Sequence, residues 1–359
     1  MARRKIIPIF IPQAGCKNKC IFCNQKGITG VNKIPNKDEL LALMPQGGCD
    51  YELAYYGGSF TALPIKTMVA YLDFAQKMRE EGRIGKIRLS THPSSLNDEK
   101  IAILKDYGVN SVELGIQSMD DEVLIKAGRG HTKREILYSM FLVKNNGFDL
   151  GVQLMTGLPY ETPKKIFSGI EEILPYAPNM VRIYPLLVLQ DTPLALEYAA
   201  GKYKPMPLNA AVSLVRDMYA VFSYYKIPVI RMGLQPTVDL NIHSDLLLDG
   251  PFHPSFGHLV KSALKLKQIE MVLRDAPDGV RIITAKKDLP QVYGLNGENI
   301  SKIAEHHHIA VSGTGDLQGT VSLAPFDKSK RSEIIASLGE SEFLKKYLNE
   351  NEFWSKQCI

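Results

Sequence analysis

The sequence lacks any hydrophobic run long enough to cross a membrane, and it has few cysteines. No apolar stretch approaches the ~20 residues that a membrane-spanning helix needs, so we expect no membrane segment. The segment IIPIFIP near the start is too short and too interrupted by proline to be the core of a secretion signal. With five cysteines in 359 residues, we therefore expect a cytoplasmic protein with reduced thiols rather than a disulfide framework.

An excess of charge of one sign is also missing. The formal net charge of +5 permits an anionic partner, but it is far below the charge density of a dedicated nucleic-acid-binding protein. We find no short repeat and no low-complexity tract. The length suits one large globular domain with a small second one.

What is present is a recurring order of strand, Gly- or Pro-marked turn and helix. Apolar and β-branched runs predict six strands, at residues 6–12, 53–60, 86–90, 109–117, 148–159 and 179–189. Because a helical pattern follows each run, the strands should pair in parallel through right-handed crossovers. Six units are too few for a closed eightfold barrel, so we expect an open, partial parallel β/α barrel with its chemistry at the carboxyl ends of the strands.

The strand–helix order loosens after residue 205, and we predict a barrel domain of residues 1–260 and a small α+β domain of residues 261–359. In the second, VYGLNGENISKIAEHHHIAV (292–311) has the pattern of a KH module, with GVRIITA (279–285) as its first strand. The G-x-x-G loop of a KH module clamps a nucleic-acid backbone. Here the loop is followed by Glu298 and contains no basic residue, so we expect a KH-like fold without RNA binding. We expect His306–His308 to be surface residues rather than a metal site.

Three cysteines, Cys16, Cys20 and Cys23, stand in the stretch GCKNKCIFCNQ (15–25). A closed structural zinc site takes four ligands, and a [4Fe–4S] cube also normally takes four thiolates. Three thiolates on one loop leave one iron open to a small molecule that carries adjacent amine and carboxylate donors. The alternative is three free cysteines, or a zinc site completed by a distant histidine.

The spacing C-x₃-C-x-aromatic-C after a first strand, with a Gly-Gly turn after the second, resembles the radical S-adenosylmethionine (SAM) superfamily. Further segments make residues 6 to about 256 similar to the catalytic subunit of Elongator, a tRNA-modifying enzyme, and to its smaller bacterial relatives; they are VELGIQSMDDEVL, GRGHT, GVQLMTGLP, VRIYPLLVL and VIRMGLQPT. We expect the acetyltransferase domain of that subunit to be absent. The resemblance implies a [4Fe–4S] cluster, SAM, an electron donor such as flavodoxin or ferredoxin, and a 5′-deoxyadenosyl radical that abstracts hydrogen from the substrate.

The resemblance also implies roles for residues around the cofactor. Cys16, Cys20 and Cys23 would bind the cluster. The other candidates for cofactor binding are Phe22, Asn24, Gly57, Gly58, Ser59, Phe60, Ser90, Gln117, Arg129 and Gln153. Phe22 would lie against the adenine ring, and the backbone near Asn24 would read the edge of that base.

The second-strand turn YYGGSF would approach the methionine amino group, because glycine backbone has no Cβ in the way. Ser59 stands there where the family has an acidic residue. Gln117 and Gln153 would face the ribose hydroxyls, and Arg129 the methionine carboxylate, because a guanidinium fork matches a carboxylate. A solvated arginine and a buried structural amide are the alternatives for Arg129 and Gln153.

Four residues are candidates for the substrate side: Arg182, Tyr184, Arg231 and His92. A structural role is the alternative for the first three. His92 stands where the resemblance leads us to expect an arginine, which puts a shared substrate in doubt. We expect Glu113 to face the barrel interior or a structural partner, and we favour a helix-capping role for His131.

Three functions remain open. One is radical modification of a tRNA base, and another is chemistry on a free nucleobase, as in queuine lyases, which cleave a C–N bond of queuine. The third is a non-catalytic RNA-binding protein that has kept the fold. The uncharged G-x-x-G loop, the modest net charge and the altered STHPSS segment (90–95) favour the free base.

Overall fold

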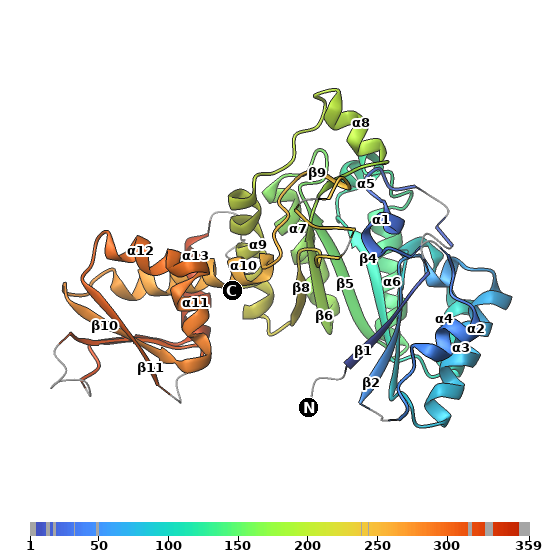
Figure 1. Ribbon diagram of the computed structural model, residues 1–359, viewed down its shortest axis with the longest axis horizontal. Coiled ribbons are helices and arrows are strands. Elements are labelled where there is room, and N and C mark those ends of the chain that lie inside the picture. The colour runs from blue at the N-terminus through green and yellow to red at the C-terminus, as the bar shows by residue number, and fades with distance from the viewer. Residues whose placement is uncertain are drawn as a thin grey trace. The chain divides into compact units, whose positions relative to one another are not determined.

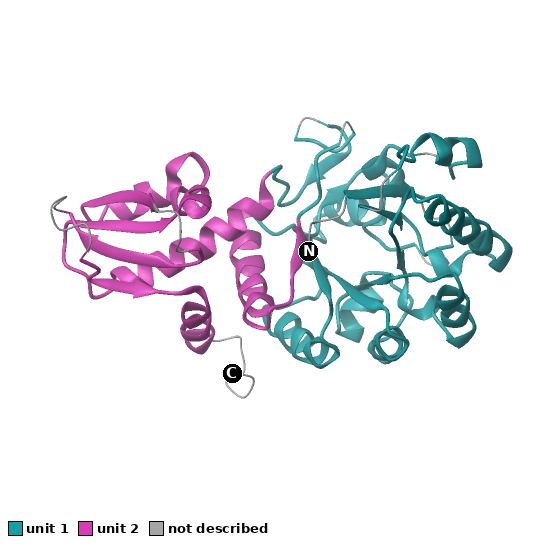
Figure 2. Cartoon of the chain, turned by 90° about the horizontal axis from the view of Figure 1, so that it is seen from below, with its two compact units in different colours: residues 1–207, 233–254 teal, residues 208–232, 255–359 magenta. Residues whose placement is uncertain are grey.

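The computed structural model describes residues 5–11, 15–16, 19–31, 33–47, 50–237, 239–242, 244–314, 318–326 and 333–351. Contacts divide the chain into two compact units, one of residues 1–207 and 233–254 and one of residues 208–232 and 255–359 (Figure 2). The predicted boundary at residue 260 falls within helix α10 (Phe256–Leu273), and the division into two folding domains stays a prediction. No helix in the described ranges is both long and apolar enough to span a membrane.

A seven-stranded sheet contains six strands of the larger unit and one strand of the second unit (Figure 1). Its strands are β1 (Lys5–Phe10), β2 (Tyr51–Tyr56), β3 (Lys86–Thr91), β4 (Ser111–Gln117), β5 (Asp149–Thr156), β6 (Met180–Pro185) and β8 (Val229–Met232), in the order β1-β2-β3-β4-β5-β6-β8. Successive strands pair in parallel. The sheet is an open half-barrel, which confirms the predicted fold class and adds a seventh strand.

Most of the connecting helices begin with the same device, a capping side chain. They are α3 (Ile65–Glu80), α4 (Asp98–Asp106), α5 (Asp121–Lys126), α6 (Lys133–Asn145), α7 (Pro163–Ile173) and α8 (Pro193–Ala199), with the short α1 (Gln25–Thr29) and α2 (Lys37–Ala42) before β2. Polar side chains accept a backbone amide of the first turn in α4 to α8; they are Asn97, Asp120, Thr132, Thr162 and Thr192. Each such cap stabilises its helix by roughly 1 kcal/mol and fixes where the chain turns back from the sheet.

The two faces of the half-barrel differ in chemistry. Alternate strand residues are apolar and almost fully buried; they include Leu53, Tyr55, Ile87, Leu89, Val112, Leu114, Leu150, Val152, Val181 and Ile183. Because side chains alternate along a strand, the residues between them point to the other, concave face. There the sequence places charged and polar groups, namely Glu52, Tyr56, Arg88, Ser90, Glu113, Gln153, Arg182 and Tyr184. The concave interior of the half-barrel is therefore polar.

The second unit contains a mixed four-stranded sheet. Its order is β11 (Ile309–Thr314), β10 (Val280–Ala285), β12 (Val321–Pro325), β13 (Ala336–Leu338), with β11 parallel to β10 and the other neighbours antiparallel. Helices α9 (Leu208–Tyr224), α10, α11 (Leu289–Tyr293), α12 (Glu298–Ala304) and α13 (Glu340–Glu350) accompany it. This confirms the predicted small α+β domain, with a first strand close to the predicted 279–285.

Gly151 leaves the space that lets Glu113 lie across the interior. A Cβ at position 151 would come within 2.6 Å of Glu113 Cγ. We expect Gly151→Ala to lower the free energy of unfolding by about 1–3 kcal/mol, because the extra methyl overpacks a fixed side chain. Urea unfolding measures this. Gly47→Ala, where nothing lies within 4 Å, should change stability by less than about 0.5 kcal/mol; equal effects of the two substitutions would contradict the packing argument.

Candidate active site

The cysteine loop is fastened to segments that follow two different strands. The Ile21 amide donates to the Ala127 carbonyl at the end of α5 (3.1 Å), and the Ile21 carbonyl accepts from the Leu194 amide of α8 (2.9 Å). Since α5 follows β4 and α8 follows β6, these bonds place the loop at the carboxyl end of the half-barrel. The position agrees with the expected place of the chemistry.

Asn24 anchors the end of this loop. Its side-chain oxygen accepts the Gly27 amide (3.0 Å) and so caps α1, while its Nδ2 donates to the Gln190 carbonyl (2.9 Å). The Asn24 side chain thus fixes the turn after Cys23 and also joins the cysteine loop to the loop that contains Gln190. The role predicted for the Asn24 backbone stays a prediction.

Arg129 contacts the cysteine loop directly. Its Nη1 donates to Cys20 Sγ (2.9 Å) and its Nη2 to the Gly115 carbonyl (2.5 Å). The side chain is buried, and its Nε has no hydrogen-bond partner in the described part of the protein. A buried cation with an unused donor favours an anionic group beside the loop.

The three thiols lie close enough to interact electrostatically. Burial, and then the neighbouring Cys20 and Cys16, raise the pKa of Cys23 to about 12. Burial also raises the pKa of Cys16, with a contribution from Cys20, while a hydrogen bond from the Ser59 backbone and the charge of Arg129 lower it. Without a cation between them, Cys16 and Cys23 therefore favour their protonated form.

A chain of buried hydroxyls ends at Ser59, in the turn after β2. Thr61 Oγ1 donates to the Ser95 carbonyl (2.9 Å) and lies 2.6 Å from Thr91 Oγ1, which lies 3.0 Å from Ser59 Oγ. The His92 amide donates to Ser59 Oγ (3.1 Å).

The carbonyl at the end fixes the direction of every hydrogen bond in this chain, because it only accepts. Thr61 gives its one proton to the carbonyl, so Thr91 must donate to Thr61, and Ser59 must donate to Thr91. Ser59 Oγ keeps one lone pair that no described residue uses, so it offers an acceptor and no donor.

His92 and His131 form a pair beside Arg129. His92 Nε2 lies 2.9 Å from the Arg129 carbonyl and 2.8 Å from His131 Nδ1, and the rings meet edge to face. Burial, and then the charge of Arg129, lower the pKa of His92 to about 4 and that of His131 to about 3. Both rings are therefore neutral near pH 7.

The helix-capping role favoured for His131 is wrong. Thr132 caps α6, in a reciprocal pair of hydrogen bonds with Glu135. The contact between His92 and His131 joins residues 39 positions apart, and no local sequence pattern signals it.

Two predicted amides contact each other, and two predicted aromatic residues share an apolar cluster. Gln153 Nε2 lies 3.3 Å from Gln117 Oε1, and Gln117 has a positive φ of 71° at a bulge between β4 and β5. Phe22 and Tyr184 are partly buried against one apolar cluster that includes Leu158. The structure thus brings together the predicted amide pair, and it places the aromatic residue of the cysteine loop and Tyr184 on one cluster.

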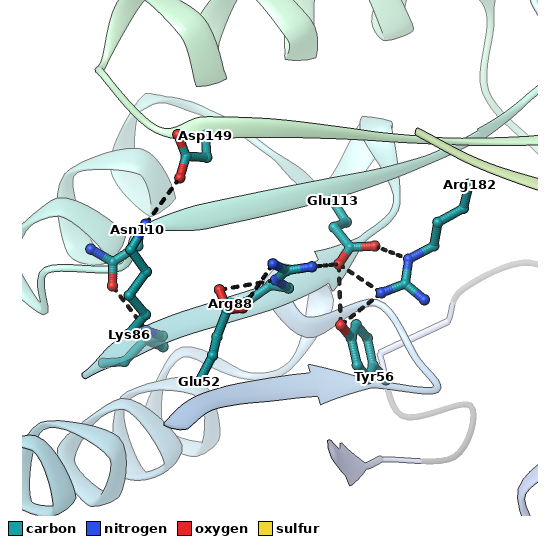
Figure 3. Close-up of polar contacts among 9 residues, drawn as sticks. Glu52, Tyr56, Lys86, Arg88, Asn110, Glu113, Asp149 and Arg182 are labelled. Carbon is teal, nitrogen blue, oxygen red and sulfur yellow. Dashed lines mark hydrogen bonds and ion pairs between the residues drawn. The ribbon is translucent and has the colours of Figure 1, made fainter. Parts of the chain in front are cut away.

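The interior also holds four charged side chains in contact (Figure 3). Arg88 Nη2 lies 2.8 Å from Glu52 Oε2, and its Nη1 lies 3.1 Å from Glu113 Oε1. Arg182 Nε lies 2.6 Å from Glu113 Oε2. Two carboxylates and two guanidinium groups balance one another, so burying them costs less than burying any one alone.

This network resolves the two alternatives for Glu113, which faces the interior and also has structural partners there. Tyr56 adds a hydroxyl that donates to Glu113 Oε1 (3.2 Å) and accepts from Arg182 Nη2 (2.8 Å). Glu52, Arg88 and Tyr56 were not among the predicted site residues. Their signal was a charged or polar residue at alternate positions of otherwise apolar strands.

Comparisons with known proteins show the family to which this chain belongs. Residues 10–171 match the model of the radical SAM superfamily, and residues 178–266 match the model of a radical SAM C-terminal domain. The chain belongs to the radical SAM superfamily. The cofactors of this radical SAM protein are a [4Fe–4S] cluster and SAM.

Two curated relatives and one solved structure are similar to this chain. A tRNA uridine(34) acetyltransferase of Methanocaldococcus jannaschii is 29% identical over 229 residues, which cover 58% of this chain and 41% of the relative. The heme chaperone HemW of Bacillus subtilis is 28% identical over 138 residues, 38% of this chain and 36% of HemW. The radical SAM chain therefore spans less than half the length of either relative. The archaeal Methanocaldococcus infernus Elp3 with an N-terminal deletion shares the fold, with a TM-score of 0.58 at 20% identity over 90% of this chain and 74% of that one.

The residues present fit the two cofactors. Each cysteine of a cube binds a different iron, so the thiols need not converge on one point. Indeed, no three His, Cys, Asp or Glu side chains among the described residues are grouped to hold a single metal ion. The unused Arg129 Nε offers a donor beside Cys20, and Ser59, whose backbone contacts Cys16, offers an acceptor.

The remaining predicted residues are spread more widely. Ser90 is half-buried on the concave face. Gly57 has a φ of 90° in the turn before Ser59, and Gly58 follows it. Phe60 stacks on Tyr55 in the core at 4.8 Å, so its ring packs the turn. Arg231 lies in β8, which belongs to the second unit. The roles predicted for these residues stay predictions.

In the second unit, the side chain of Asn299 packs against the G-x-x-G loop (294–297). A Cβ on Gly294 would come within 2.9 Å of Asn299, whose Nδ2 donates to the carbonyls of Ser262 and Gln291. Glu298 pairs with Lys302 at 2.8 Å. The nearby lysine is thus already neutralised, and the lack of RNA binding stays a prediction. His306–His308 follow α12 rather than lying within it.

The neutral histidine pair should make stability depend on pH. Below about pH 6.5 the unfolded histidines bind protons while the folded ones do not, so the free energy of unfolding falls on acidification. Between pH 6.5 and 5.5 we expect a loss of about 2 kcal/mol for the two residues. Urea unfolding should show this loss in the wild type and in the exposed control His306→Asn, but not in the double variant His92→Asn/His131→Asn. An equal loss in the double variant would refute the assignment.

Proposed function

We propose that this radical SAM protein is an enzyme that removes a hydrogen atom from a nucleobase, and that the base is free rather than part of RNA. Our specific candidate is cleavage of a C–N bond of queuine, which would make the enzyme a lyase. The observation that carries the proposal is the contact of the buried Arg129 with Cys20 at the open end of a polar, charge-balanced interior.

When bound, the cluster and SAM supply a 5′-deoxyadenosyl radical that abstracts hydrogen. The chain must orient SAM so that its C5′ lies in van der Waals contact with one C–H of the substrate, and it must exclude water. An external one-electron donor of the flavodoxin or ferredoxin class completes the proposal. We place the enzyme in the cytoplasm.

We assign the cofactor contacts by chemistry. Cys16, Cys20 and Cys23 would hold three irons, and Arg129 would donate its unused Nε–H to the methionine carboxylate. Ser59, which offers only an acceptor, would take a hydrogen bond from the methionine ammonium, as a carboxylate would. The other predicted contacts are Phe22 at the adenine ring and Gln117 and Gln153 at the ribose. The chemistry of the two amides supports this, since they both donate and accept.

The charges of the described residues support a free base. The network of Glu52, Arg88, Glu113 and Arg182 has no net charge with which to attract a phosphate backbone, and Lys302, beside the loop at residues 294–297, is paired with Glu298. The second candidate, a base within tRNA, is favoured by the relative named a tRNA uridine(34) acetyltransferase. In that case the enzyme would be a tRNA-modifying transferase.

The anaerobically reconstituted and reduced enzyme should form 5′-deoxyadenosine faster with queuine than without it, at least tenfold. The cysteine variant Cys20→Ala should form none, because one iron loses its ligand. Chromatography and mass spectrometry measure both 5′-deoxyadenosine and the released base. Stimulation by bulk tRNA instead, with strongly salt-dependent binding, would favour the second candidate. No 5′-deoxyadenosine under any condition would contradict an enzymatic function.

The direction of the hydroxyl chain predicts a selective loss in Thr91→Val. Without the Thr91 hydroxyl, Ser59 loses its proton acceptor and no longer presents a fixed lone pair. We expect the Kd of SAM for the cluster-loaded enzyme to rise about tenfold, or ~1.4 kcal/mol. The Kd of 5′-methylthioadenosine, which lacks the amino-acid end, should stay within twofold. Ser139→Ala, which removes a buried hydroxyl bonded to the Ile136 carbonyl in α6, is the matched control. A parallel loss for both ligands would contradict the role of Ser59.

A further inference from the structure

Arg182 joins the charged network to Tyr184. Its Nε pairs with Glu113 Oε2 at 2.6 Å, and its Nη2 donates to Tyr56 Oη (2.8 Å) and Glu113 Oε1 (3.1 Å). Its guanidinium also lies over the Tyr56 ring, 5.0 Å from the centroid. Figure 3 shows Arg182 reaching from β6 toward Glu113 and Tyr56. The guanidinium is thus held in one orientation from two sides.

Counting protons leaves two donors free. Nη1 of Arg182 carries two hydrogens and has one acceptor among the described residues, Tyr184 Oη at 3.3 Å. Tyr184 accepts that bond, and no described residue accepts its own hydroxyl proton. The two side chains come from positions 182 and 184 of β6, so they point to the same face. One N–H and one O–H therefore lie within a hydrogen-bond length of each other, without acceptors.

Tyr184 and the cysteine loop pack against the same apolar cluster. The Tyr184 ring packs on the apolar cluster of Leu158, Leu186 and Val188, which Phe22 also contacts. Phe22 stands between Cys20 and Cys23 in the sequence. A planar ligand between the cysteine loop and the charged network would therefore meet the Arg182 and Tyr184 donors at its edge.

Charge decides which acceptor suits these donors. Glu113 touches both Arg182 and Arg88, and Glu52 also pairs with Arg88, so the group is neutral as a whole. A phosphate or a carboxylate would bring an unbalanced negative charge into this interior, at the cost of its hydration. A carbonyl oxygen accepts two hydrogen bonds without adding charge.

We propose that Arg182 and Tyr184 recognise a carbonyl oxygen on the substrate base, and that Glu113 and Tyr56 position Arg182 for this contact. This inference rests on the proposed free-base function and adds the specificity of its site. A base that lacks the carbonyl leaves both donors without an acceptor, so it is rejected. The phosphate of a nucleotide would not strengthen binding at this site.

The test measures the Kd of three bases for the anaerobic, cluster-loaded enzyme with SAM bound: queuine, guanine, and 2-aminopurine, which lacks the carbonyl of guanine. We expect the wild type to bind guanine at least tenfold more tightly than 2-aminopurine, and guanosine 5′-monophosphate no more tightly than guanosine. In Tyr184→Phe, binding of queuine and guanine should weaken about tenfold, and that of 2-aminopurine less than twofold. Tyr138→Phe, which removes a hydroxyl bonded to Asp98 on the surface, is the matched control and should bind all three bases as the wild type does.

A second variant separates recognition from folding. Replacing Arg182 alone leaves Glu113 without one of its two buried cationic partners, so the pair Glu113→Gln/Arg182→Gln keeps a neutral, hydrogen-bonding interior. It should retain the SAM affinity of the wild type and lose the preference for guanine over 2-aminopurine.

The outcomes distinguish this inference from the function on which it rests. If bases bind the wild type but Tyr184→Phe and the double variant keep the full preference for the carbonyl, the inference is overturned and the free-base function stands. If SAM binds but none of the bases does, the free-base function fails and the recognition site fails with it. Tighter binding of the monophosphate would overturn the charge argument specifically.

Discussion

The carboxylate of Glu113 is the group on which the interior of the half-barrel depends. A parallel sheet covered by helices buries its strands on both faces, and most such sheets fill both with apolar side chains. Here the concave face holds charges, which is tolerable only because each cation has an acidic partner within about 3 Å. Glu113 joins a cation from β3 to one from β6, across β5. Removing it would leave two guanidinium groups to repel one another in a poorly solvated space.

The other polar side chains named above form separate groups. Arg182 contacts both Tyr56 and Tyr184, and the amides of Gln117 and Gln153 contact each other. Gln153 is the strand partner of Arg182, so the amide pair lies beside the charged network. The proposed chemistry takes place where Arg129 contacts Cys20.

The sequence predicts the framework of the fold because hydrophobic periodicity and turn residues are local signals. The strands, their parallel order and the loop of Cys16, Cys20 and Cys23 all follow from such signals. What escapes is the pairing of distant polar groups. The contact of His92 with His131, the hydroxyl chain through Thr61 and Thr91, and the network around Glu113 join residues from separate crossover units. Helix capping misled the interpretation of His131, since Thr132 beside it is the better cap.

The hydrogen bonds in the hydroxyl chain behind Ser59 have one fixed direction. Its far end is a backbone carbonyl in the short turn Pro93–Ser95, which has no proton to send back, so the dipoles cannot flip in concert. A carboxylate in the same place would gain a proton in acid and turn from acceptor to donor. This protein instead anchors its acceptor to main-chain geometry, and the polarity that Ser59 presents is indifferent to the acidity of its surroundings.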